Sequence, residues 1–66
     1  MASVEFIEGT NRYTPSGPVF YNGRKGRLWK RYQRRQGCWV YGGTQFHPIK
    51  ATRADVAFYR TPDIQG

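Results

Sequence analysis

The sequence predicts a small β-rich single domain, either an antiparallel meander or a small barrel of three to five strands, with one short C-terminal helix. The chain has 66 residues, enough for one hydrophobic core but not for two. Short apolar segments rich in aromatic and β-branched residues alternate with turn residues along most of its length. One such segment leads directly into Asn22-Gly23, a dipeptide typical of a two-residue hairpin turn.

The first third of the chain predicts two strands and a hairpin. Residues 3–8 alternate polar and apolar side chains, which predicts a strand. Residues 9–17 contain two glycines, a proline and several small polar residues, and we expect a turn there. Residues 18–21 are apolar and predict the second strand. The loop 22–26 would then carry its two basic residues at the tip of the hairpin.

Residues 27–36 fit either a strand or a helix. As a helix, the segment would be basic and amphipathic and would end at Gly37. Both neighbouring segments resemble hairpin partners, and no N-cap residue precedes Arg27, so we favour the strand. Alternation then places these residues on two faces: Leu28, Lys30 and Tyr32 on one, and Trp29, Arg31 and Gln33 on the other.

The remaining segments predict a second hairpin and the helix. Residues 38–41 predict a strand, Gly42-Gly43 a turn, and residues 44–49 the returning strand. Proline has no backbone donor, so Pro48 should lie on an edge strand or end it. Residues 52–60 fit either a strand or a helix, and we favour a short helix that begins with a cap by Thr52 and Asp55.

These elements predict one domain over residues 1–66, with flexible termini at 1–2 and 61–66. A closed form of the sheet would be an SH3-like or OB-like barrel. The apolar residues available for a core are few. The expected members, besides some aromatic residues, are Val4, Phe6, Val19, Leu28, Val40, Ile49 and Val56. On the helix, we expect Ala54, Ala57 and Phe58 to share the packing stripe.

The distribution of charge is the main indication of function. The chain has 11 Lys and Arg against 4 Asp and Glu, a formal net charge of +7. All four acids lie outside residues 9–54. Seven basic residues lie within 24–35, and such a run repels itself unless a polyanion neutralises it.

Aromatic residues interleave with this basic run, and the combination suits nucleic acid. Cations neutralise phosphates, while aromatic rings stack on unpaired bases. We therefore expect a non-catalytic nucleic-acid-binding protein, with single-stranded or structured RNA or DNA favoured over plain duplex. Trp29 and Tyr32 are the expected stacking residues, and Trp39 is expected in the core. The expected binding residues are Arg24, Lys25, Arg27, Trp29, Lys30, Arg31, Tyr32, Arg34 and Arg35.

Three local resemblances also indicate nucleic acid. GRKGRLWKRY resembles the GXXG loop and following helix of KH domains, and GRKGRLWKRYQRRQG is similar in composition to arginine-rich RNA-binding peptides. GGTQFHPIKATRADVAFY resembles the wing and last helix of excisionase-type winged-helix proteins. None spans the chain, so the sequence assigns no family.

The rival hypothesis is a small interaction protein or inhibitor that docks on an acidic surface of a larger protein, because Arg and aromatic residues also favour such interfaces. The sequence leaves the oligomeric state open. No catalytic site, metal site or cofactor is expected, since Cys38 and His47 are the only candidate N/S ligands. His47 is expected on the surface and Cys38 in the interior. No signal peptide or membrane span is expected, and the lone cysteine suits a reducing, cytoplasmic location.

Overall fold

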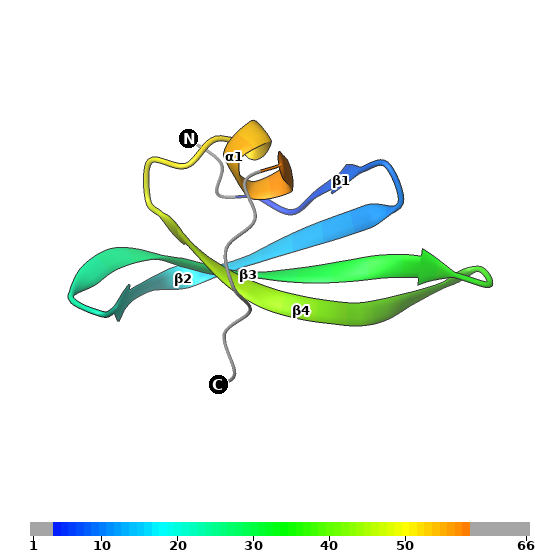
Figure 1. Ribbon diagram of the computed structural model, residues 1–66, viewed down its shortest axis with the longest axis horizontal. Coiled ribbons are helices and arrows are strands. Elements are labelled where there is room, and N and C mark those ends of the chain that lie inside the picture. The colour runs from blue at the N-terminus through cyan, green and yellow to red at the C-terminus, as the bar shows by residue number, and fades with distance from the viewer. Residues whose placement is uncertain (1–3, 59–66) are drawn as a thin grey trace.

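The computed structural model describes residues 4–58, which form a four-stranded antiparallel sheet and one short helix (Figure 1). The strand order is β1-β2-β3-β4. The elements are β1 (Phe6–Glu8), β2 (Asn11–Tyr21), β3 (Arg24–Arg35), β4 (Cys38–Pro48) and α1 (Arg53–Phe58). The predicted meander with a C-terminal helix is confirmed. β1 and β4 are the two edges of the described sheet, which is open rather than a closed barrel.

Two tight turns connect the long strands. Asn22 and Gly23 have φ of 51° and 76°, and Gln36 and Gly37 have φ of 50° and 78°. Two successive residues in the left-handed region make the turn type that matches the twist of a hairpin. The hairpin at Asn22-Gly23 is confirmed, although its loop is two residues rather than five. Arg24 already belongs to β3 and pairs with Tyr21.

The segment that fits both helix and strand is a strand. β3 pairs with β2 on one side and with β4 on the other along nearly its whole length, so it is the centre of the long part of the sheet. The alternative of a basic helix at 27–36 is therefore wrong, and with it the resemblance to the helix that follows a KH loop. The segment is a strand because a hairpin turn flanks it on each side, and each turn places a partner strand beside it.

The turn predicted at residues 9–17 is confirmed only for Gly9 and Thr10 and is wrong for residues 11–17, because β2 begins at Asn11. The strand accommodates its prolines at a register shift between Pro15 and Pro18. At this irregularity the Ser16 hydroxyl accepts a hydrogen bond from the Leu28 N–H (3.0 Å). A side chain thus replaces a missing ladder partner, which explains how a segment rich in turn residues remains in the sheet.

Gly42-Gly43 is a bulge within one continuous strand and not the predicted turn. Arg31 pairs with Gly43 and Tyr32 with Tyr41, so Gly42 is the extra residue. Gly43 has φ of 133°, a conformation that side chains rarely adopt. Residues 44–48 therefore extend β4 and do not form a separate strand. Pro48 ends β4 at the edge of the sheet, as predicted.

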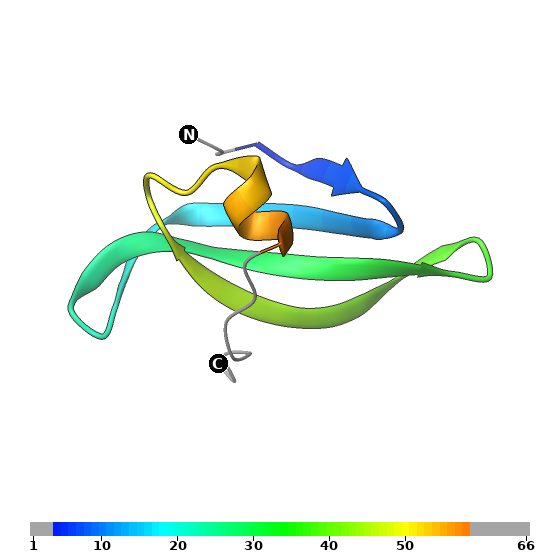
Figure 2. The ribbon, with the colours of Figure 1, turned by 45° about the horizontal axis from the view of Figure 1, so that its top comes forward.

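Helix α1 lies over one face of the sheet, and β1 lies on the same side of the long strands as α1 (Figures 1 and 2). It begins with the predicted cap: the Thr52 N–H donates to the Asp55 carboxylate (2.9 Å), and the Asp55 N–H donates to the Thr52 hydroxyl (3.2 Å). The predicted helix is confirmed for 53–58, and residues 59–60 lie outside the described residues. So do residue 3 of the first predicted strand and the predicted flexible termini at 1–2 and 61–66.

The core lies between α1 and the sheet and combines aromatic side chains with small aliphatic ones. Its buried members are Tyr13, Trp29, Ala51, Val56 and Ala57, with Phe6 packed against them. Phe6 stacks on Tyr13 with ring centroids 5.1 Å apart and meets Trp29 edge-on at 5.8 Å.

Several apolar residues expected in the core lie elsewhere. Val4 and Val40 are exposed, and so are Ala54 and Phe58 on α1, where Val56 and Ala57 make the packing face instead. A helix of six residues has room to bury only one narrow stripe.

Candidate functional site

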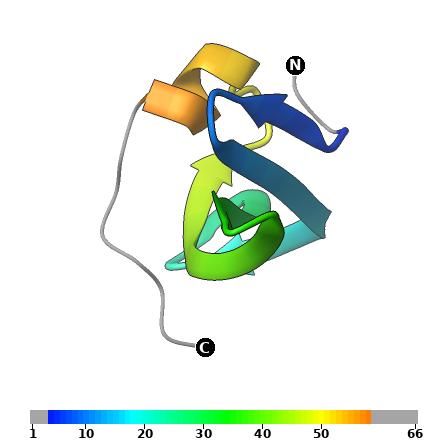
Figure 3. The ribbon, with the colours of Figure 1, turned by 90° about the vertical axis from the view of Figure 1, so that its right-hand side faces the viewer.

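The sheet has an inner face, which carries α1, and an opposite face that no described element covers (Figure 3). We call the latter the open face. The register assigns each side chain to a face, because directly paired residues of an antiparallel sheet lie on the same side. Trp29 and Tyr13 belong to the inner face, since both are in the core beneath α1.

Strand alternation divides the basic run between the two faces. The open face receives Arg24, Lys30 and Arg34, and the inner face Lys25, Arg27, Arg31 and Arg35. The expectation of a single basic face containing all seven residues is therefore not met. A run of cations in a strand cannot lie on one face, because successive side chains point to opposite sides.

Two of the inner arginines make contacts within the fold. Arg27 donates through Nη1 to the Ser16 carbonyl (3.1 Å), at the irregularity in β2. Arg31 donates through Nη2 to the Gly42 carbonyl (2.8 Å), at the bulge in β4. Both side chains are half-buried. These contacts give the two arginines a structural role at the bulges.

The two expected stacking residues separate. Trp29 is 1% exposed at the centre of the core, so it presents no ring face to a ligand and its expected stacking role does not fit its position. Tyr32 lies on the open face, half-buried, and meets Tyr41 of β4 edge-on with ring centroids 5.9 Å apart. The Tyr41 hydroxyl is hydrogen-bonded to the Thr44 hydroxyl, which fixes the ring against the sheet.

Trp39, expected in the core, lies on the open face near two arginines. The guanidinium carbons of Arg12 and Arg34 lie 6.0 and 5.9 Å from its ring centroid. Arg12 also forms an ion pair with Glu5 (2.8 Å). The hydrogen bonds from Arg12 and Thr14 hold the pKa of the Glu5 carboxyl below its usual value. Aromatic rings and guanidinium groups thus lie close together on this surface.

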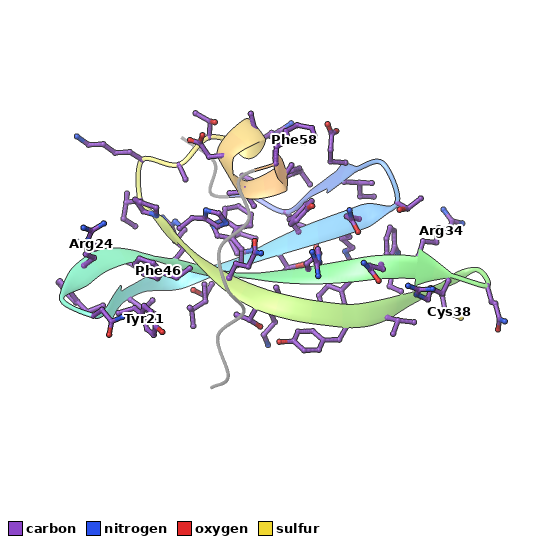
Figure 4. The ribbon with its side chains drawn as sticks, viewed as in Figure 1. Tyr21, Arg24, Arg34, Cys38, Phe46 and Phe58 are labelled. Atoms are coloured by element: carbon purple, nitrogen blue, oxygen red, sulfur yellow. The ribbon has the colours of Figure 1, made fainter. Side chains whose placement is uncertain are left out.

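A second aromatic pair lies at the other end of the open face. The rings of Tyr21 and Phe46 are 5.3 Å apart, close to the Asn22-Gly23 turn, and Arg24 follows the turn directly (Figure 4). Phe46 lies against Gly26: a Cβ on that glycine would meet the Phe46 ring and the His47 carbonyl oxygen. A side chain at position 26 would therefore displace the Phe46 ring or the backbone of β4.

The Gly42 bulge determines which aromatic residues reach the open face. Thr44 pairs with Lys30 and lies on the open face. Without the bulge, strict alternation would place residues 42, 40 and 38 on the open face as well, and Trp39 and Tyr41 would point to the inner face. The extra residue shifts the register by one and turns Trp39 and Tyr41 outward instead. The glycine pair that resembles a turn in the sequence thus sets the composition of the site.

The open face contains residues that the sequence did not single out for binding. They are Arg12, Tyr21, Trp39, Tyr41 and Phe46. Arg12 is separated from the basic run by eleven residues without charge, and only the pairing of Arg12 with Tyr32 brings it there. The aromatic residues were visible in the sequence, but their face depends on the bulge, which no sequence pattern distinguished from a turn.

His47 and Cys38 occupy positions opposite to those expected. His47 is 2% exposed on the inner face, where its Nε2 lies 3.4 Å from the Gln45 side-chain oxygen. Burial lowers its pKa, and the nearby Asp55 partly opposes that shift. Cys38 is exposed beside the Gln36-Gly37 turn (Figure 4).

Within residues 4–58, no three His, Cys, Asp or Glu side chains gather in a way that could hold a metal ion. The helix described there is also too short and too polar to cross a membrane. The chain matches no protein-family model, no curated protein sequence and no solved structure. The open face itself is therefore the basis for a functional assignment.

Proposed function

We propose that this protein binds nucleic acid through the open face of its sheet. The observation that carries the proposal is the gathering of aromatic rings and cations on one uncovered surface. Its centre is Trp39, whose ring has the guanidinium groups of both Arg12 and Arg34 about 6 Å away. The members of the proposed interface are Arg12, Tyr21, Arg24, Lys30, Tyr32, Arg34, Trp39, Tyr41 and Phe46.

The cations of this surface would neutralise phosphates. Lys30 and Arg34 lie four residues apart on β3, and Arg24 lies six residues before Lys30, so the three follow the length of the strand. These three can contact about three phosphates, which predicts a slope near −2 for log K against log salt on a single strand, since Arg12 is already paired with Glu5. The net charge of +7 adds long-range attraction to any polyanion.

The aromatic residues favour unpaired bases. Tyr41 is 55% exposed and Tyr21 40%, so their rings are accessible at the two ends of the face. Base stacking on such rings contributes about 1–3 kcal/mol for each base and tolerates any sequence. Single-stranded or structured RNA or DNA therefore suits this surface better than a plain duplex, in which the bases already stack on one another.

A fluorescence-anisotropy titration tests the proposal. Labelled single-stranded RNA, single-stranded DNA and duplex DNA are titrated at several salt concentrations, with the wild type and with Tyr41→Ala. We expect Tyr41→Ala to weaken single-strand binding roughly 5- to 150-fold, which corresponds to the loss of one stacked base. Phe20→Ala is the matched control, because Phe20 is 76% exposed but lies on the inner side of β2.

Two results would contradict the proposal. One is no binding to any of the three ligands at low salt. The other is binding that Phe20→Ala and Tyr41→Ala weaken equally, which would mean that no particular face is used. An affinity for a protein that depends on one aromatic residue and hardly on salt would instead support the rival, an acidic protein partner.

A further inference from the structure

The two edges of the sheet differ in how well they are protected against pairing with a strand of another chain. Edge strands present unpaired backbone groups, and proteins usually block them with short strands, prolines, bulges or charged side chains. β1 has three residues and carries Glu8. Beyond β1, the edge of β2 contains Pro15 and Pro18 at its register shift. One side of the sheet is therefore well protected.

The opposite edge, β4, has little such protection over its first half. The strand has 11 residues and, alone among the strands described in residues 4–58, contains no Lys, Arg, Asp or Glu. Its proline is the last residue, and its bulge lies at Gly42. Residues 38–41 before the bulge form a regular ladder with β3 on one side and have no described strand on the other (Figure 1).

The side chains of this half suit association. Val40 is 46% exposed and Tyr41 55%, and both are apolar or aromatic in a chain that otherwise exposes many cations. β-Branched and aromatic side chains are those that stabilise cross-strand pairs. The cations of β3 lie one strand further in, so two copies meeting at β4 would not bring like charges into direct contact.

We propose that two copies of this chain associate through residues 38–41 of β4, paired antiparallel about a twofold axis at Val40. This register places Val40 opposite Val40 of the second copy and Trp39 opposite Tyr41. An axis perpendicular to the sheet keeps the open faces of both copies on the same side, because paired residues share a face. The four strands of each copy then form one continuous eight-stranded sheet.

The association uses the backbone edge of β4, whereas the proposed nucleic-acid interface uses the open-face side chains, two of which (Trp39 and Tyr41) lie on this segment. Val40 pairs with Gln33 and lies on the inner side of β4, whereas the binding cations lie on the open face. The two events also respond to salt in opposite ways. Two copies of charge +7 repel each other, so salt should strengthen dimerisation, whereas salt weakens phosphate binding. Association without nucleic acid therefore tests this inference independently of the proposed function.

Sedimentation equilibrium of the full chain, in reductant and without nucleic acid, tests the association. We expect a monomer–dimer equilibrium with Kd between about 1 µM and 1 mM, as a small interface gives. Val40→Lys places two lysines directly opposite each other and should abolish the dimer, while Val40→Thr, which keeps a β-branched side chain, should retain it. Circular dichroism and thermal unfolding show that the variants are folded.

Cysteine crosslinking tests the register. Paired Cα atoms of an antiparallel ladder are about 4.5–5.5 Å apart, a separation that a disulfide can span. Val40→Cys, combined with Cys38→Ser, should therefore crosslink readily when oxidised glutathione is added. The native Cys38 should not, because its Cα would lie roughly 14 Å from that of the second copy. A chain that stays monomeric throughout, or that crosslinks at Cys38 as readily as through Val40→Cys, would overturn the inference.

Discussion

The two tryptophans are chemically the same residue but differ entirely in surroundings. Trp29 is enclosed by Phe6 and α1 in the core, whereas Trp39 is half-buried on the open face near two guanidinium groups. Trp29 lies within the basic run and Trp39 in an uncharged segment, so local composition predicted the opposite assignment. Their difference comes from strand register, which places one above the sheet and the other below it.

Substitution of each tryptophan should separate stability from binding. Trp29→Ala removes the largest fully buried side chain and should lower the free energy of unfolding by about 3–5 kcal/mol, enough to unfold a domain of this size. Trp39→Ala should cost stability much less and should weaken binding to single-stranded nucleic acid. Urea unfolding followed by circular dichroism measures the first effect. A Trp29→Ala variant of wild-type stability would contradict the assignment of the core.

The buried His47 should make stability depend on pH. Burial lowers its pKa in the folded state, so the unfolded state binds the proton more readily. Its contribution is complete above the unfolded pKa near 6.5 and is lost as the pH falls below that value. Thermal unfolding between pH 7.5 and 5.5 should show a declining Tm in the wild type and a flatter profile in His47→Gln. This pH window lies above the lowered pKa of the Glu5 carboxyl, so protonation of Glu5 reduces stability only at more acidic pH.

At the scale of elements, a short sequence motif predicted the local structure correctly where the motif has only one structural interpretation. Asn22-Gly23 predicted a hairpin, and Thr52 with Asp55 predicted a helix start, because each rests on hydrogen bonds or dihedral angles within four residues. Gly42-Gly43 is compatible with two structures. A glycine pair can end a strand or make a bulge in it, and the partner strand, β3, determines which occurs.

Adding a side chain at Gly37, in the Gln36-Gly37 turn, should reduce stability more than adding one at a glycine outside the left-handed region. Gly37 has φ of 78°, and a left-handed conformation costs other residues about 1–2 kcal/mol. Gly37→Ala should therefore lower the free energy of unfolding by about that amount. Gly17→Ala is the matched control, since its φ is not in the left-handed region and nothing lies within 4 Å of an added Cβ. Equal effects in urea unfolding would contradict the turn geometry.

The cap of α1 should contribute measurably to stability. Thr52→Ala removes the hydroxyl that accepts the Asp55 N–H and should lower the free energy of unfolding by about 1 kcal/mol. Thr52→Ser keeps the hydroxyl and should be nearly neutral. Because α1 covers the core through Val56 and Ala57, loosening it should also speed hydrogen exchange of the amides beneath it. An unchanged midpoint for Thr52→Ala would show that the cap is dispensable.

At the scale of the whole molecule, the sequence predicted the amount of charge and the meander but not the composition of the binding surface. The excess of cations and aromatic residues follows from counting. The surface they make depends on alternation in β3, on the Gly42 bulge, and on the pairing that brings Arg12 beside Trp39. These are non-local features, because each requires knowing which strand pairs with which and in what register.

The most direct test of the open-face account compares two adjacent arginines near the end of β3. Arg34 and Arg35 are both exposed, but Arg34 lies on the open face beside Trp39 and Arg35 on the inner face. Arg34→Glu and Arg35→Glu change the net charge equally, so any difference between them reports the face. The account predicts that Arg34→Glu weakens single-strand binding at least tenfold more than Arg35→Glu, in anisotropy titrations at the same salt concentration. Equal losses would contradict it and would mean that binding depends on total charge rather than on the open face.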